Sequence, residues 1–150
     1  MIKVMFVCLG NICRSPMAEF VLRDMVDKKG IADKFLIRSS ATSTEEVGND
    51  IHYGTRQKLT EKGIPFVPRR AVQFTRGDYE NYDYILVMEE KNIRGLRRII
   101  GEDKLGKIHR LLDYTSRGGD IADPWYTGNF EDTYRDVVDG CAAFLEYLGE

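Results

Sequence analysis

The stretch that decides the fold is VMFVCLGNICRSP, residues 4–16. The apolar run from Ile2 to Val7 lacks clean alternation, which is typical of a strand buried on both faces in a parallel sheet. Ser15 is a good helix N-cap, and Pro16 suits the first helical position. We therefore expect residues 8–14 to form a loop between the end of a strand and the start of a helix. Backbone N–H groups and the helix dipole attract an anion to such a loop.

Two residues give this loop a chemistry. A helix N-terminus and a nearby cation favour the thiolate of Cys8, which is the nucleophilic form. The planar guanidinium of Arg14 can hold two phosphate oxygens at once. A loop with five residues between them can curl round one tetrahedral oxyanion and stabilise its equatorial oxygens during phosphoryl transfer. Cys-x5-Arg alone is a weak motif, because buried cysteines are usually inert hydrophobes; the strand, Gly10 and the helix start favour catalysis.

Composition limits the class of protein. The 150 residues predict a single domain over 1–150, and a formal net charge of −2 implies no bulk attraction to nucleic acid or to an acidic membrane. No apolar run approaches the roughly 20 residues that span a bilayer, and the start does not resemble a signal peptide, so the cytoplasm is expected. Three cysteines argue against a disulfide framework. His52 and His109 lie far apart, and we expect no metal site.

Strands alternate with helices along the rest of the chain. Strands are predicted at 35–39, 84–88 and 107–112, and helices at 15–29, 52–62 and 90–100, with a helical turn near 75–78. Segments 40–50, 64–74 and 113–129 lack a regular pattern. The last helix carries one apolar stripe, formed by Tyr134, Val137, Val138, Cys141, Leu145 and Leu148. This alternation predicts a parallel sheet with helices on both faces, and a ligand site where strand order reverses.

A thiolate that attacks a phosphate ester needs an acid for the leaving oxygen. Asp123 is the candidate, because Pro124 restricts its backbone and Trp125 and Tyr126 could line a crevice for an aryl group. An Asp-Pro pair also starts ordinary turns, which is the competing interpretation. No histidine lies near Cys8 in sequence, so a Cys–His protease has little support.

Three features remain open or structural on the residues alone. Cys13 either forms a reversible disulfide with Cys8, which would protect that residue from over-oxidation, or is a packed thiol. Cys141 belongs to the core. The pairs Arg69-Arg70 and Arg97-Arg98 are expected on solvated faces.

The chain resembles the low-molecular-weight protein tyrosine phosphatases over essentially its whole length. CLGNICRS at 8–15 and DPWY at 123–126 carry the resemblance, and YDYILVM at 82–88 is also similar to the family. The resemblance implies a flavodoxin-like three-layer sandwich with four parallel strands in the order 2-1-3-4. It implies metal-free and cofactor-free hydrolysis through a phosphocysteine at Cys8.

The resemblance also implies roles for single residues. Arg14 would bind phosphate and stabilise the transition state, while Asp123 would protonate the leaving phenolate and then activate water. Asn11, supported by Ser39, would hold the loop in a strained conformation, since asparagine tolerates positive φ. Relatives that act on phosphoarginine tend to have Thr where this chain has Ile12, so Ile12 suggests phosphotyrosine. Ser15 would donate to the Cys8 thiolate. The remaining phosphate-binding, supporting and substrate-lining residues would be Leu9, Gly10, Cys13, Ser39, Trp125 and Tyr126.

The chain departs from the family at three positions. Glu45 stands where a substrate-facing aromatic is common, Arg69 where relatives can have His, and Glu89 where an Asp is common. The expected partners are a phosphotyrosine protein or peptide and inorganic phosphate as product, with no nucleic acid and no membrane. Two other functions compete with a phosphatase. An arsenate reductase needs two further relay cysteines, and residues 79–101 contain none. A phosphoprotein-binding module would tolerate loss of Cys8 or Asp123, and both are present.

Overall fold

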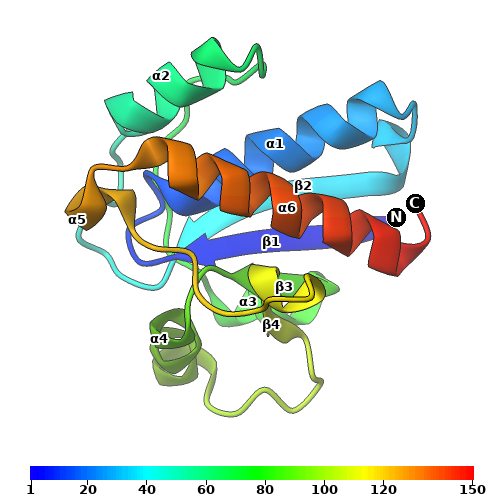
Figure 1. The fold of residues 1–150 in the computed structure, drawn as a ribbon. Helices are drawn as coiled ribbons and strands as arrows, with labels where there is room; N and C mark the ends of the chain where they lie inside the picture. Colours follow the sequence, from blue (N-terminus) through cyan, green and yellow to red (C-terminus); the bar gives the residue numbers. More distant parts are fainter.

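Four parallel strands form the centre of the molecule in the computed structural model, which describes residues 1–150 (Figure 1). They are β1 (Ile2–Cys8), β2 (Phe35–Ala41), β3 (Tyr84–Val87) and β4 (Ile108–Arg110). The order across the sheet is β2-β1-β3-β4, and every neighbouring pair is parallel. The predicted sheet and its order 2-1-3-4 are therefore confirmed.

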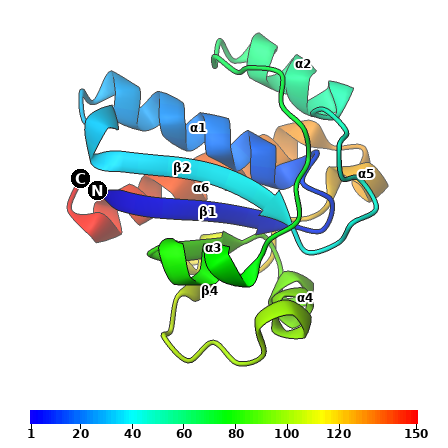
Figure 2. The same cartoon turned by 180° about the vertical axis from the view of Figure 1, so that it is seen from behind.

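Helices cover both faces of the sheet. On one face lie α1 (Arg14–Lys28) and α6 (Phe130–Leu148), with α2 (Tyr53–Glu61) packed against both of them (Figures 1 and 2). On the other face lie α3 (Arg76–Asn81) and α4 (Glu90–Ile100). The short helix α5 (Pro124–Thr127) precedes α6, and two 3-10 turns cover Ala32–Lys34 and Leu111–Tyr114. The sheet and the helices on its two faces therefore form three layers. None of the helices combines the length and the apolar character that a membrane span requires.

The side chains of β1 explain why its sequence does not alternate. Val4 and Phe6 belong to the larger core under α1 and α6, whereas Met5 and Val7 belong to the smaller core under α3 and α4. All four are at most 4% exposed. Both faces of the strand are shielded from solvent, so apolar side chains are favoured on both of them.

The patterns predicted for two helices are confirmed. Helix α4 has the predicted bounds, and its C-cap is Gly101, which has φ +78°. In α6, residues Val137, Cys141 and Leu145 of the predicted stripe are at most 2% exposed. Phe144 is also fully buried and was not predicted, because it lies beside the stripe on the same face.

Three local predictions were wrong. Helix α1 begins at Arg14 with Cys13 as its N-cap, so Ser15 is inside the first turn, and its hydroxyl bonds the loop instead of capping. Pro16 is tolerated there because N–H groups of the first turn have no intrahelical partner. Strand β4 spans three residues, and the chain after it turns into the 3-10 helix 111–114. The segment 113–129 also contains α5, a helix too short for a periodic signal.

Candidate active site

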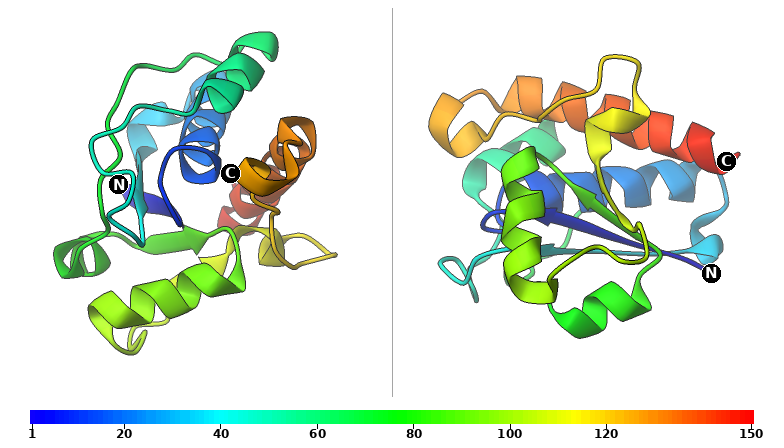
Figure 3. Two further views of the ribbon diagram at one scale, coloured as in Figure 1. Left: turned by 90° about the vertical axis from the view of Figure 1, so that its left-hand side faces the viewer. Right: turned by 90° about the horizontal axis from the view of Figure 1, so that it is seen from below.

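A crevice of about 120 Å³ opens at the carboxyl end of β1. The strand order reverses here, because β1 is followed by β2 on one side and β3 on the other. Seen from this end, the 8–14 loop lies among the β2–α2 connection, α4 and α5 (Figure 3). The crevice is lined by Cys8, Leu9, Gly10, Ile12, Cys13, Arg14, Glu45, Glu46, Asp123, Trp125 and Tyr126.

Cys8 lies on the floor of this crevice and is 3% exposed. Its sulfur accepts the backbone N–H of Asn11 at 3.3 Å and lies 3.1 Å from the hydroxyl of Ser15. Five residues separate the end of the strand from the start of helix α1, whose N-terminus adds partial positive charge. The Asn11 N–H, the Ser15 hydroxyl and the helix N-terminus therefore all lie on the side of the loop that faces the sulfur.

Asn11 fixes the shape of the loop from behind. It is the only non-glycine residue with positive φ, at +59°, and its side chain is fully buried. The amide nitrogen donates to Ser15 Oγ at 2.8 Å and to Ser39 Oγ at 3.0 Å. Ser39 in turn donates to the buried carboxylate of Glu19 at 2.5 Å. The expected strained conformation of Asn11 and its contact with Ser39 are both present.

Arg69 overturns the expectation that its pair of arginines lies on a solvated face. Its guanidinium donates to the Asn11 carbonyl at 2.6 Å, to the Asn11 side-chain oxygen, and to Ser39 Oγ at 3.4 Å. Asp50 accepts its backbone N–H at 3.1 Å. Arg70, the next residue, is exposed. Only folding brings Arg69 to the loop, so neighbouring residues in sequence gave no signal of this contact.

Arg14 is 2% exposed and lies between two carboxylates. One terminal nitrogen donates to Glu89 and to the Ile121 carbonyl at 2.9 Å, and the other is 3.3 Å from Asp123 Oδ2. Burial opposes the charge, but Cys8, Asp123 and Glu89 outweigh it and raise the pKa of Arg14 above its ordinary value. The guanidinium is therefore permanently charged and held in one orientation. Glu89 makes this contact although it departs from the family pattern.

Asp123 is placed over the crevice by the start of α5. It is the N-cap of that helix, and its Oδ1 accepts the N–H of Trp125 at 3.0 Å. Pro124 occupies the first position of this helix, which the sequence did not predict. Trp125 and Tyr126 follow at the rim, 57% and 78% exposed. The sequence interpretation that grouped these residues with Cys8 is consistent with this arrangement.

The remaining predicted residues divide between wall and support. Leu9, Gly10, Ile12 and Cys13 line the crevice, whereas Ser15 and Ser39 lie behind it. Cys13 is a free thiol, like Cys8, and burial followed by the charges of Cys8 and Asp123 raises its pKa to about 12. A disulfide between them stays a prediction. No three His, Cys, Asp or Glu residues are grouped so that they could hold a metal ion.

The position of Cys141 argues against the alternative of an arsenate reductase. It is fully buried between α6 and α1, and its sulfur lies 3.9 Å from the Ala18 carbonyl. A relay of disulfide exchange requires sulfurs within reach of one another, and Cys141 does not line the crevice. The core role predicted for Cys141 is confirmed.

A cysteine and an arginine that enclose a phosphate-sized loop on an α/β sheet are typical of cysteine-dependent phosphatases. The sequence comparisons lead to one family of this class. Residues 3–150 match the family described as low molecular weight phosphotyrosine protein phosphatase, and the chain belongs to it. It is an enzyme of that family, a hydrolase.

Relatives match over almost their whole length. The chain is 43% identical to the low molecular weight protein-tyrosine-phosphatase YfkJ of Bacillus subtilis, with 97% of this chain and 94% of that protein covered. It is 41% identical to the human low molecular weight phosphotyrosine protein phosphatase, with 96% and 94% covered.

Solved structures agree with the sequence matches. The crystal structure of YfkJ superposes with a TM-score of 0.95 at 42% identity, covering 99% of this chain and 95% of that one. The Streptococcus pyogenes phosphatase SP-PTP superposes at 0.87 with 41% identity, covering 99% and 93%. A Drosophila arginine phosphatase superposes at 0.89 with 27% identity, covering 99% of both chains.

Proposed function

We propose that the protein hydrolyses phosphotyrosine in proteins or peptides through a phosphocysteine on Cys8. One observation carries the proposal: Cys8 and Arg14 of one loop meet Asp123, which lies 109 residues beyond Arg14, at one crevice of phosphate size. Inorganic phosphate is the second product. No nucleic acid or membrane takes part, and the cytoplasmic location stays a prediction.

The first step transfers the phosphoryl group to sulfur. The Cys8 thiolate attacks phosphorus, the bond from phosphorus to the phenolic oxygen breaks, and Asp123 gives its proton to that oxygen. Arg14 and the loop N–H groups hold the three equatorial oxygens, where charge is spread in the transition state. Arg14 has little rotational freedom because Glu89 and the Ile121 carbonyl hold it, so its side chain loses little conformational entropy when phosphate binds.

The second step returns the enzyme to its starting state. Asp123, now a carboxylate, takes a proton from water, and the water oxygen attacks phosphorus. The bond from phosphorus to sulfur breaks, phosphate leaves, and Cys8 is again a thiolate. Ser15 and the Asn11 N–H stabilise that thiolate as a leaving group through the contacts at 3.1 and 3.3 Å.

The depth of the crevice supports an aryl substrate. Cys8 and Arg14 are nearly inaccessible at the floor, while Trp125 and Tyr126 are exposed at the rim. A phenyl group is long enough to place phosphate on the floor while its ring contacts the aromatic rim, whereas the short arm of phosphoserine is not. Ile12 adds an apolar wall beside the ring.

Phosphoarginine is the second candidate, because a solved neighbour is described as an arginine phosphatase. The test is release of phosphate from matched phosphotyrosine, phosphoserine and phosphoarginine peptides, with reductant and without added metal. We expect release from phosphotyrosine alone. A preference for phosphoarginine would contradict the substrate class but keep the Cys8 chemistry.

Two variants test the roles of the residues. Cys8→Ser should abolish turnover while phosphate still binds. Asp123→Ala should lower kcat by roughly 100-fold, as loss of a general acid does. Full activity of Asp123→Ala on a phosphotyrosine peptide would remove the acid role from that residue. Mild peroxide should give a Cys8–Cys13 disulfide that thiol reverses, seen by mass spectrometry; irreversible inactivation without that bond would exclude it.

A further inference from the structure

The rim of the active-site crevice carries charges that the proposed chemistry does not use. Glu45 and Glu46, from the connection between β2 and α2, line the crevice itself. Lys91, from the first turn of α4, lines an adjoining hollow of about 310 Å³ that shares Leu9, Arg14, Asp123 and Tyr126 with the crevice. Glu45 and Glu46 therefore stand on one wall of the phosphate site, and Lys91 stands on the other beside Glu89, whose carboxylate is paired with Arg14.

None of these three charges forms an ion pair within the chain. Glu45 is exposed and makes no hydrogen bond or ion pair, and the same is true of Lys91. Glu46 makes only one side-chain contact, accepting the side-chain N–H of Asn49 at 2.6 Å. The rim charges are therefore free to meet a ligand.

Glu46 is held in place against the phosphate loop. A Cβ at Gly10 would lie 3.2 Å from Glu46 Cγ, so the glutamate stem packs directly on the loop backbone. Its charge acts inside the crevice: burial, Cys8 and Asp123 raise the pKa of Cys13, and Glu46 adds to the same effect. A carboxylate so close to the site of a phosphate dianion repels it unless a cation stands between them.

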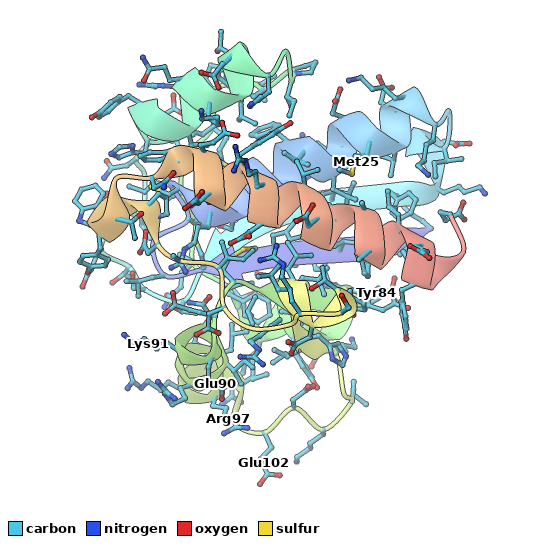
Figure 4. The ribbon with its side chains drawn as sticks, in the orientation of Figure 1. Met25, Tyr84, Glu90, Lys91, Arg97 and Glu102 are labelled. Atoms are coloured by element: carbon cyan, nitrogen blue, oxygen red, sulfur yellow. The ribbon has the colours of Figure 1, made fainter.

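Lys91 belongs to the opposite wall. It projects from the start of α4 at the end of the molecule where α5 lies, whereas Glu102 extends from the loop after α4 (Figure 4). The hollow beside Lys91 adjoins the crevice, because Tyr126 is among the residues that line both. A peptide whose phosphotyrosine fills the crevice therefore has Glu45 and Glu46 on one side and Lys91 on the other.

We propose that Glu45 and Glu46 bind a basic residue on one side of the phosphotyrosine and that Lys91 binds an acidic residue on its other side. The inference rests on the proposed function and names the substrate class within it: a phosphotyrosine segment of asymmetric charge. Peptides acidic on both sides of the tyrosine are poor substrates, because one of their carboxylates meets the two glutamates. Glu45 thus replaces an aromatic contact with an electrostatic one.

Two isomeric peptides test the proposal. Each holds one phosphotyrosine, one lysine and one glutamate, with the two charged residues exchanged across the tyrosine. A third peptide has glutamate on both sides. We expect one isomer to exceed the other about five- to ten-fold in kcat/KM at low salt, since each exposed ion pair contributes a factor of about two to five. The doubly acidic peptide should be poorest, and 0.5 M salt should reduce the differences.

Variants assign the effect to the walls. Glu45→Gln with Glu46→Gln should lower the preference for lysine, and Lys91→Gln should lower the preference for glutamate on the other side. The preference is a ratio between peptides, so a change in overall activity cancels. Glu102→Gln is the matched control for the loss of one exposed carboxylate far from the crevice and should keep the wild-type ratio. Equal turnover of the isomers, or a ratio unchanged in both rim variants, would overturn the proposal.

A small aryl phosphate separates this inference from the function on which it rests. Para-nitrophenyl phosphate has no flanking charge, so its hydrolysis reports the Cys8 chemistry alone. Hydrolysis of this substrate with equal use of the isomers refutes the charge selection only. No hydrolysis of any substrate by the reduced enzyme refutes the proposed function instead.

Discussion

Arg69 offers a direct test of how the phosphate loop is held, through the variant Arg69→Met. Methionine keeps the apolar stem but removes the donors to the Asn11 carbonyl, the Asn11 side-chain oxygen and Ser39. After the change, the Asn11 side-chain oxygen keeps only the Val72 N–H at 3.2 Å. The variant therefore leaves the loop oxygens short of partners in a buried place.

The magnitude follows from the two stronger bonds. A hydrogen bond from a charged donor contributes about 1.5–3 kcal/mol, and the guanidinium is partly solvated, so we expect a loss of about 3 kcal/mol for the two. For a chain of this size that corresponds to a fall in Tm of about 6–12 °C. Phosphate should bind about ten-fold more weakly, because its loop donors are no longer fixed.

Calorimetry measures both quantities, by thermal scanning and by titration with phosphate. Arg70→Met is the matched control, because the neighbouring arginine is exposed and its side chain makes no hydrogen bond. Arg69→Lys separates charge from geometry, since lysine cannot offer two fixed donors. If Arg69→Met matched Arg70→Met in Tm and in phosphate affinity, the loop would not depend on Arg69.

Three further predictions concern packing, reactivity and pH. Gly54→Ala should destabilise the protein by about 1–3 kcal/mol in urea unfolding, because its Cβ would lie 2.4–2.7 Å from the Phe130 ring. Gly77→Ala is the control and should not destabilise it in this way, because its Cβ would meet nothing nearer than 3.6 Å. Equal losses of stability in the two variants would contradict the close packing of Gly54 on Phe130. Iodoacetamide between pH 6 and 9 should label Cys8 but not native Cys13, whose thiol stays protonated because burial raises its pKa to about 12; mass spectrometry that finds Cys13 labelled first would oppose this. Hydrogen bonds from Lys58, foremost, and Lys62 lower the pKa of Glu131 from 4.5 to about 2. This lowered pKa stabilises the fold above about pH 4.5, and the contribution is lost as pH falls towards 2. Glu131→Gln should remove that part of the pH dependence of the urea midpoint, and an unchanged acid limb would show that the ion pairs contribute nothing.

The sequence predicted the strand, loop and helix around Cys8 because the signals there are local. A doubly buried run, a small turn residue and a helix start adjoin one another within 15 residues. Helix α4 was predicted with its observed bounds for the same reason, since its apolar face and the glycine after it are contiguous. Strand β4 was predicted too long, because an edge strand of three residues followed by a 3-10 turn has no recognisable sequence pattern.

The supports of the site could not be predicted from neighbouring residues. Arg69 and Glu89 reach the loop only through tertiary contacts, across 58 and 75 residues of chain respectively. Nothing in an Arg-Arg pair separates the buried partner from the exposed one. Ser15 is of a type that favours helix capping, but its hydroxyl contacts Cys8 and Asn11 instead; of these contacts, the one with Cys8 was implied by the family resemblance alone.

The most direct test of the whole account is to trap the covalent intermediate. The enzyme is mixed with a phosphotyrosine peptide carrying radioactive phosphate, quenched within milliseconds and digested, and the labelled fragment is identified by mass spectrometry. The account predicts phosphate on the fragment that contains Cys8, a larger trapped fraction in Asp123→Ala on a substrate with a good leaving group, and none in Cys8→Ser. Steady release of phosphate with no label on Cys8 at any quench time would contradict it.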